Sequence, residues 1–220
     1  MPNSLTSPPV RPLLDRLFRA ADADDTHWVT IRERHPDGVA AGSARDKADA
    51  YAELYIPVSP EGGRLLYTLI RASRPATVVE FGTSFGISTI HLAAAVRDNG
   101  TGRVVSTELN AAKVARARAN LAEAGLADVV TILAGDARET LADLPGPVGF
   151  VLLDGWKNLY LPVLRQLEPR LAAGALVVAD DTVSMAAQMT DYLAYVRDPA
   201  RGYLSVSFPE SDGLEITCRI

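Results

Sequence analysis

Short, unbroken apolar runs alternate with helical stretches from the middle of this 220-residue chain onward. Runs of this length are typical of parallel strands that are buried on both faces of a sheet. We expect strands near Thr77–Phe81, Arg103–Thr107, Val129–Ala134, Val148–Asp154 and Ala175–Asp180. We expect helices between them near Ile87–Arg97, Ala111–Ala124, Ala137–Asp143 and Leu159–Ala172. Strands and helices that alternate in this way predict an α/β fold around a parallel sheet.

Two further apolar runs close the chain after a predicted helix around Ala186–Val196. They are Tyr203–Phe208 and Leu214–Arg219, and the polar turn between them ends in Gly213, which is typical of an antiparallel hairpin. The whole pattern predicts a Rossmann-like, doubly wound, seven-stranded sheet. We expect this sheet to be mostly parallel, with a C-terminal antiparallel hairpin and one reversed edge strand.

The chain divides into three predicted segments. Residues 1–9 hold three prolines and no apolar pattern, so we expect a disordered tail. Residues 10–56 carry apolar residues at helical spacing but form no core of their own, and we expect an N-terminal helical flap, or lid. A Gly/Pro-rich break at His35–Gly42 interrupts this flap. Residues 57–220 are expected to form the main domain, whose first helix begins at Ser59 or Pro60.

Composition disfavours several classes of function. The net charge of −5 argues against nucleic acid as the main partner. The clearest basic cluster, Lys113, Arg116 and Arg118, is predicted to be a solvated helix face. Cys218 is the only cysteine, which excludes an intramolecular disulfide and a cysteine-built zinc site. Because the sequence has neither an apolar leader segment nor a run of about 20 apolar residues, we expect a cytoplasmic protein without a membrane partner.

The stretch VVEFGTSFGIST, Val78–Thr89, predicts a strand, a glycine loop and the start of a helix. Gly82 and Gly86 let the backbone turn tightly and approach a ligand at the carboxyl end of the strand. A dinucleotide-binding loop carries glycine at the position of Ser84. Glu80 places a carboxylate beside the loop, which suits a ligand with positive charge. The loop therefore favours the sulfonium cofactor S-adenosylmethionine over a nicotinamide dinucleotide.

The ends of the second and third strands add predicted contacts to the same cofactor. Glu108 lies 22 residues after Gly86, the distance at which an acid accepts hydrogen bonds from both ribose hydroxyls. Gly135, Asp136 and Ala137 end the third strand, where backbone amides and a carboxylate can bind adenine. Together with the glycine loop, these strand ends predict an S-adenosylmethionine site.

Three carboxylates are expected at the ends of the fourth and fifth strands, on Asp154, Asp180 and Asp181. Neighbouring parallel strands lie about 4.8 Å apart, so these side chains converge at one edge of the sheet. Their mutual repulsion raises their pKa values, and a hard divalent cation removes it. The pattern predicts a site for Mg²⁺, with Mn²⁺ or Ca²⁺ as alternatives. An acid cluster with one member facing the cleft is the other interpretation.

Lys157 follows Asp154 by three residues in the stretch VLLDGWKNLYLP, Val151–Pro162. A neutral amine beside the metal can accept a proton from a hydroxyl, whereas the alternative is a solvated lysine at a helix start. The carboxylates and the metal shift its pKa in opposite directions, so the sequence leaves the net shift open. Trp156 offers a flat wall for adenine or for an aromatic ring, unless it is a core residue. Packing or surface roles are expected for the three histidines: His27, His35 and His91.

These motifs resemble the class I S-adenosylmethionine-dependent O-methyltransferases, in particular the cation-dependent catechol and caffeoyl-CoA type. The likeness extends from Val58 to the end of the chain, and LLDGWKNLYLP is its densest part. It implies that Asp154 is a metal ligand, that Trp156 contacts the cofactor and that Lys157 is the catalytic base. VVADDTV, in residues 177–183, resembles the family's Asp-Asn pair and implies metal roles for Asp180 and Asp181.

The same resemblance implies further contacts to the cofactor. VVEFGTSFGIST resembles the cofactor motif and implies roles for Glu80, Gly82 and Ser88, the last at the methionine carboxylate. Val58 lies where the family has a backbone contact to that carboxylate. Residues 57–220 would then be the S-adenosylmethionine-binding methyltransferase domain. A homodimer formed through the N-terminal helices is also implied.

The implied reaction moves a methyl group from S-adenosylmethionine to a hydroxyl of a vicinal-dihydroxy, catechol-type aromatic small molecule. Two departures from the family leave alternatives open. Asp181 replaces the asparagine, and no acid matches the residue that grips the second hydroxyl. The alternatives are a metal-independent methyltransferase acting on a hydroxyl or nitrogen of another natural product, and a non-catalytic binding module or nicotinamide enzyme.

Overall fold

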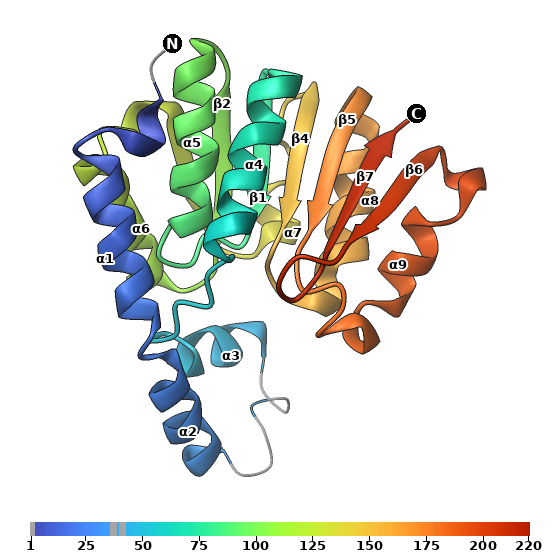
Figure 1. The fold of residues 1–220 in the computed structure, drawn as a ribbon. Coiled ribbons are helices and arrows are strands. Elements are labelled where there is room, and N and C mark those ends of the chain that lie inside the picture. The colour runs from blue at the N-terminus through green and yellow to red at the C-terminus, as the bar shows by residue number, and fades with distance from the viewer. Residues whose placement is uncertain (1–2, 36–38, 40–42) are drawn as a thin grey trace.

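The computed structural model describes residues 3–35, 39 and 43–220, and its central element is a seven-stranded sheet. The strand order is β3-β2-β1-β4-β5-β7-β6 (Figure 1). The strands are β1 Thr77–Phe81, β2 Arg103–Glu108, β3 Val130–Ala134, β4 Val148–Leu153, β5 Leu171–Ala179, β6 Tyr203–Phe208 and β7 Leu214–Arg219. Strands β1 to β5 are parallel, which confirms the predicted Rossmann-like, mostly parallel sheet.

The C-terminal hairpin is also confirmed, because β6 and β7 pair antiparallel. The reversed strand is β7, and it lies between β5 and β6 rather than at the edge. The expectation of a reversed edge strand was therefore wrong. Because β7 hydrogen-bonds to a neighbour on each side, the edge position falls to β6, whose direction matches that of the parallel strands.

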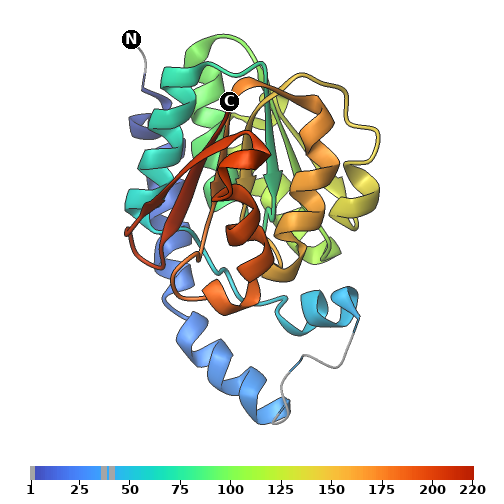
Figure 2. The ribbon, with the colours of Figure 1, turned by 90° about the vertical axis from the view of Figure 1, so that its right-hand side faces the viewer.

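Helices cover both faces of the sheet and define two apolar cores (Figure 2). One face carries α1 Val10–Ala21, α4 Pro60–Ser73, α5 Ile87–Asn99 and α6 Ala111–Glu123. The other carries α7 Ala137–Thr140, α8 Tyr160–Leu167 and α9 Thr190–Val196. Every residue of β1 is buried, as expected for a strand covered on both faces. None of the helices in the described part of the chain is long and apolar enough to cross a membrane.

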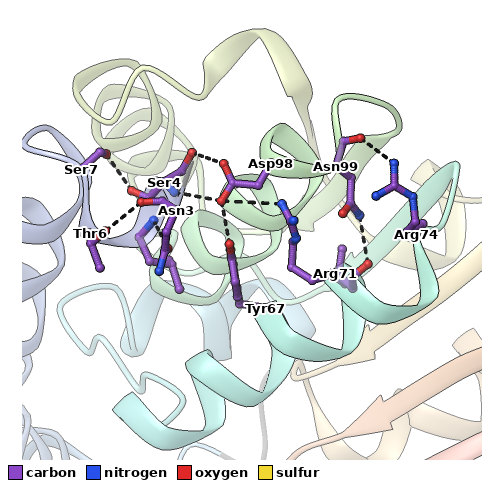
Figure 3. Close-up of polar contacts among 11 residues, drawn as sticks. Asn3, Ser4, Thr6, Ser7, Tyr67, Arg71, Arg74, Asp98 and Asn99 are labelled. Atoms are coloured by element: carbon purple, nitrogen blue, oxygen red, sulfur yellow. Dashed lines mark hydrogen bonds and ion pairs between the residues drawn. The ribbon is translucent and has the colours of Figure 1, made fainter. Parts of the chain in front are cut away.

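The described residues at the N-terminus are docked on the main domain. Residues Ser4–Thr6 form a short 3₁₀ turn, and the backbone N and Oγ of Ser4 donate to the Asp98 carboxylate at 2.8 and 2.6 Å. Tyr67 donates to the same carboxylate at 2.6 Å (Figure 3). Within the segment predicted as a disordered tail, Ser4 is thus tied to an acid of α5.

Helix α1 also departs from the predicted flap. Its buried residues Val10, Leu13, Leu14 and Leu17 join the core that α4, α5 and α6 form on the sheet. Helices α2, Asp24–Arg34, and α3, Ala44–Ala50, extend beyond the sheet at its carboxyl edge (Figure 1). The amphipathic spacing predicted α1 correctly but did not indicate which surface it packs against. Most of the predicted break at His35–Gly42 lies outside the described residues.

Two of the predicted helices depart furthest from the structure. Helix α8 ends at Leu167, and a 3₁₀ turn over Glu168–Arg170 leads directly into β5, which therefore begins at Leu171 rather than Ala175. Pro169 removes a backbone donor, which explains why the helix does not continue to Ala172. The helix expected over Ala186–Val196 is divided into a 3₁₀ turn at Ala186–Gln188 and the shorter α9.

The sheet register aligns the ends of its central strands. Phe81 of β1 pairs with Leu153 of β4, which pairs with Ala179 of β5. The next residue along β4, Asp154, donates its backbone N–H to the Phe81 carbonyl at 2.8 Å, and Asp180 donates in the same way to Leu153 at 3.0 Å. Asp154 and Asp180 therefore lie next to each other, one at the carboxyl end of β4 and the other at the carboxyl end of β5.

Candidate active site

A cavity of about 460 Å³ lies over the carboxyl ends of the parallel strands and reaches helices α2 and α3. Loops after β1, β2, β3 and β4 contribute to its wall. The predicted site residues that line it are Val58, Gly82, Ser84, Ser88, Glu108, Asp136, Ala137, Asp154, Trp156, Lys157 and Asp181. The structure thus brings together most of the side chains that were singled out from separate motifs.

The glycine loop is held closely against the end of β4. Gly82 has a φ of 107°, a conformation that favours glycine, and a Cβ at this position would clash with the Asp154 carbonyl. Gly86 caps the start of α5 with a φ of 89°, and it shapes the loop without lining the cavity. Gly82 therefore fixes the close approach of β1 and β4, while Gly86 sets the direction of the helix.

Glu108 connects the loop after β1 to the start of α6. Its two carboxylate oxygens accept backbone hydrogen bonds from Ser84, at 2.9 Å, and from Asn110, at 2.8 Å. Asn110 in turn caps α6 by accepting from the Lys113 backbone N–H. The acid predicted to bind ribose is thus held in a fixed orientation on the cavity wall.

Glu80 does not line the cavity in this structure. The side chain is fully buried, and Thr89 donates to its Oε2 at 2.5 Å while Ser106 donates to the same atom. Burial raises the pKa of the Glu80 carboxyl despite these hydrogen bonds. Glu80 thus connects β1 to β2 and to the first turn of α5, and its contact with the cofactor stays a prediction.

The three predicted acids meet at the edge of the sheet. One carboxylate oxygen from each of Asp154, Asp180 and Asp181 lies within 4.8 Å of the others. Burial, followed by repulsion from Asp180, raises the pKa of Asp154 well above its usual range. Burial and the charge of Asp181 raise the pKa of Asp180 to about 6. Three oxygen donors at this separation fit a hard divalent cation.

Lys157 occupies the centre of this acid cluster. Its Nζ lies 2.6 Å from Asp181 Oδ2 and 3.5 Å from Asp154 Oδ1, and it donates to the Tyr160 hydroxyl at 2.7 Å. Burial opposes the ammonium, but the carboxylates of Asp154 and Asp181 outweigh it and raise the pKa of Lys157. Lys157 is therefore a protonated counter-ion of the carboxylates in this arrangement.

Aromatic side chains line the side of the cavity formed by α2 and α3. Trp28 meets Tyr51 edge-on at 5.2 Å between ring centroids, and Tyr51 lies 5.6 Å from Trp156. Tyr55 stacks on Phe85 at 4.0 Å. These rings give the cavity flat apolar surfaces that suit adenine or an aromatic acceptor.

Several lining residues were missed by the sequence analysis, and Lys113 is the clearest correction. It was assigned to a solvated face with Arg116 and Arg118, yet it is 7% exposed and lines the cavity, while both arginines are exposed. The signal was present, because Lys113, Ala117 and Asn120 recur at helical spacing on the buried face of α6. Charge alone is a poor guide to which side of a helix faces solvent.

A second, smaller cavity of about 70 Å³ adjoins the acid cluster. Asp180 faces this space instead of the large one, together with Glu210 and Asp212. Glu210 accepts a hydrogen bond from Ser59 Oγ at 2.7 Å.

His91 is buried in α5, and desolvation lowers its pKa to about 4, in keeping with the predicted packing role.

The chain is similar to known methyltransferases. A family model described as a methyltransferase domain matches residues 79–182. Catechol O-methyltransferase B from Danio rerio is 30% identical over 187 residues, which cover 79% of this chain and 69% of that protein. Catechol O-methyltransferase from Mycobacterium tuberculosis is 34% identical over 148 residues, covering 67% of this chain and 66% of that protein.

Solved structures show the same similarity. A cofactor-bound protein from MTB superimposes with a TM-score of 0.71 at 28% identity, covering 80% of this chain and 88% of that one. The O-methyltransferase TomG from Streptomyces achromogenes, in complex with SAM, has a TM-score of 0.69 at 24% identity and covers 87% of this chain and 96% of that one. The second comparison concerns the fold alone.

Proposed function

This chain belongs to the catechol O-methyltransferase family and is an S-adenosylmethionine-dependent O-methyltransferase, and from that premise we propose that its acceptor is a vicinal-dihydroxy aromatic small molecule. We further propose that a divalent cation assists the reaction and that Lys157 is the base. One observation carries the proposal: Lys157 and two members of the acid cluster, Asp154 and Asp181, border the same cavity as the glycine loop.

The proposed metal ligands are Asp154, Asp180 and Asp181. Their oxygens are close enough for one ion. Burial, followed by repulsion from a neighbouring aspartate, raises the pKa values of Asp154 and Asp180, and a cation would stabilise their charged forms. When bound, Mg²⁺, Mn²⁺ or Ca²⁺ supplies positive charge that lowers the pKa of an acceptor hydroxyl and favours the neutral form of Lys157. This charge would offset the carboxylates that otherwise keep Lys157 protonated.

The geometry around Lys157 supports its proposed role in removing the proton of the acceptor hydroxyl. It is nearly buried, and the Tyr160 hydroxyl at 2.7 Å from Nζ restricts its orientation. Tyr160 also donates to the Asp180 carbonyl at 3.2 Å, which ties Lys157 to the end of β5. A lysine held in this way can act as a general base without a large search over rotamers.

The proposed cofactor site lies along the ends of β1, β2 and β3. Glu108 is the proposed partner of the ribose hydroxyls, which its fixed position on the cavity wall supports, and Asp136, Ala137 and Trp156 border the position proposed for adenine. Gly82, Ser84 and Ser88 supply the loop that approaches the methionine end, where Val58 is also placed. The methyl group would thus lie between this loop and Lys157.

Helices α2 and α3 are the proposed lid, in place of the whole segment 10–56. Trp28 and Tyr51 bring aromatic surface from these helices to Trp156. Closure of an aromatic lid over a planar acceptor would exclude water and hold the hydroxyl against the methyl donor.

The test is methylation of a panel of vicinal-diol aromatics and their single-hydroxyl analogues, with S-adenosylmethionine in Mg²⁺ or in excess EDTA. We expect vicinal diols to be preferred and activity to fall by at least about a hundredfold in EDTA, because one hydroxyl loses its acidifying cation. Full activity in EDTA would contradict the metal-assisted mechanism. Equal rates with single-hydroxyl acceptors would contradict the proposed acceptor class.

A metal-independent O-methyltransferase is the second candidate, and the Lys157–Asp181 ion pair at 2.6 Å favours it. In this arrangement the ammonium already compensates part of the negative charge, as a cation would. Isothermal titration of the protein with Mg²⁺ separates the two candidates. Heat of binding that is lost in Asp154→Ala supports the metal site, whereas activity without any detectable metal binding supports the alternative.

A further inference from the structure

Lys113 is a buried cation on the cofactor side of the cavity with no assigned function. It lies in the first turn of α6, is 7% exposed and lines the cavity. Its Nζ donates to Ser84 Oγ at 3.2 Å and lies 5.5 Å from the centre of the Phe85 ring. An ammonium in such surroundings has lost most of its water, and a single hydroxyl replaces little of it.

Three acids act on the charge of Lys113, namely Glu108, Asp24 and Glu53, and the first two accept hydrogen bonds from other groups. Glu108 accepts from the backbone N–H groups of Ser84 and Asn110. Asp24 accepts from the backbone N–H groups of Tyr55 and Ile56, at 2.9 and 2.7 Å. Within the described residues, no carboxylate oxygen lies within the 4.0 Å of an ion pair with Lys113. The side chain therefore presents a positive charge to the cavity without a direct counter-ion.

The contacts of Ser84 locate this charge at one end of the cavity. Ser84 Oγ donates to the Tyr55 carbonyl at 2.8 Å, and the Tyr55 ring stacks on Phe85 beneath the ammonium. The acid cluster lies at the ends of β4 and β5, whereas Lys113 lies in the first turn of α6, after β2, and contacts Ser84 in the loop after β1. An anionic group of a ligand would be repelled by the cluster and attracted to the ammonium of Lys113.

S-adenosylmethionine carries one anionic group, the carboxylate of its methionine moiety. We propose that Lys113 binds this carboxylate, as a charged partner in addition to the loop that follows β1. The inference rests on S-adenosylmethionine being the cofactor and deepens the assignment of that site. Ser84, through its contact with Nζ, acts as a positioning residue that keeps the ammonium directed toward the cavity.

The test compares two ligands that differ in the methionine part. S-adenosylhomocysteine keeps the carboxylate, whereas 5′-methylthioadenosine keeps the nucleoside and sulfur but lacks the amino-acid end. Isothermal titration calorimetry measures both dissociation constants for the full-length protein and for Lys113→Met. We expect the affinity for S-adenosylhomocysteine to fall by about 10- to 100-fold, and that for 5′-methylthioadenosine to change by less than about threefold.

Three further variants make the result specific. Arg116→Met removes a cation from the exposed face of the same helix and is expected to change neither affinity. Lys113→Gln keeps a donor for Ser84 without the charge, and we expect it to reproduce the loss with S-adenosylhomocysteine if Lys113→Met folds poorly. Lys47 also lines the cavity, from α3, so Lys47→Met tests the other cation within reach.

Several results would overturn the inference. Equal weakening of both ligands would place Lys113 at the nucleoside or in the fold, and unchanged affinity for S-adenosylhomocysteine would remove its role altogether. A selective loss in Lys47→Met but not in Lys113→Met would assign the carboxylate to α3. Failure of the unaltered protein to bind either ligand would instead contradict the cofactor assignment itself.

Discussion

Two buried lysines line one cavity, and their surroundings differ. Lys157 lies 2.6 Å from Asp181 and 3.5 Å from Asp154, whereas Lys113 contacts a hydroxyl and an aromatic ring. The carboxylates raise the pKa of Lys157 against the effect of burial. Burial lowers the pKa of Lys113, because the nearby carboxylates of Glu108, Asp24 and Glu53 compensate it only in part.

The difference teaches that the same side chain serves opposite purposes according to its nearest charges. Lys157 is balanced by the protein itself, so a ligand must change that balance before the amine can act as a base. Lys113 lacks a close carboxylate among the described residues, so an anionic ligand would improve its environment. On the proposed roles, the acid cluster and the glycine loop divide the cavity into a proton-transfer half and a cofactor-binding half.

The largest expected effect follows substitution of Lys157, the lysine that is paired with Asp154 and Asp181. Lys157→Met keeps the length of the side chain but cannot accept a proton, so we expect kcat to fall by about 10²- to 10⁴-fold. Affinity for S-adenosylhomocysteine should change by less than about threefold, since Lys157 belongs to the proton-transfer half. Steady-state kinetics and calorimetry on one preparation measure both.

Arg116→Met is the matched control, because it removes a cation from an exposed position and should leave kcat unchanged. A Lys157→Met protein that turned over at a near-normal rate would show that another group, or water, removes the proton. A large loss of cofactor affinity in that variant would instead contradict the proposed division of the cavity into two halves.

A smaller effect is expected on the free energy of unfolding, which should respond differently to substitution of Lys157 and of Lys113. In the absence of metal and ligand, Lys157→Met leaves the acids Asp154 and Asp181 without their counter-ion, and we expect a loss of about 2–4 kcal/mol in the free energy of unfolding. Lys113→Met removes an ammonium held by one 3.2 Å hydrogen bond, so stability should change by less than about 1 kcal/mol or increase.

Urea unfolding in EDTA, followed by circular dichroism, measures both changes. Added Mg²⁺ should recover part of the stability lost in Lys157→Met, because a cation can replace the missing ammonium among the carboxylates. Similar losses in the two variants would contradict the comparison, since they would give Lys113 a structural role equal to that of Lys157.

The sequence predicted the position of a site residue best where the course of the backbone alone determines that position. Parallel strands must end at a common edge, so Asp154, Asp180 and Glu108 could be assigned to it from strand order alone. Orientation could not be predicted in the same way. Glu80 belongs to a strand buried on both faces, and its burial behind the loop depends on Ser106 of the neighbouring β2.

The sequence also did not predict which surfaces of the protein pack against each other. The apolar spacing of α1 predicted a helix with one buried face, but several surfaces can bury such a face. In the structure α1 completes the core over α5 and α6, while the flap is reduced to α2 and α3. Lys113 was missed for a related reason: its charge was given more weight than its position on the buried face of α6.

The smallest expected effect concerns Asp181, the residue that departs from the family's asparagine. Its φ of 62° lies in the left-handed region, which asparagine also tolerates, so Asp181→Asn should keep the backbone in place. The substitution removes a charge that raises the pKa of Lys157, so that pKa should fall. Since a base works in its deprotonated form, the rising limb of kcat against pH should move to lower pH.

Profiles of kcat against pH at saturating Mg²⁺ and substrate measure this displacement. Asp143→Asn removes one negative charge from an exposed position before β4, and its profile should match that of the parent. A profile for Asp181→Asn that stayed in place would show that a group other than Lys157 governs the limb. Displacement to higher pH would contradict the ion pair as the cause, because losing a neighbouring carboxylate can only make the ammonium a stronger acid.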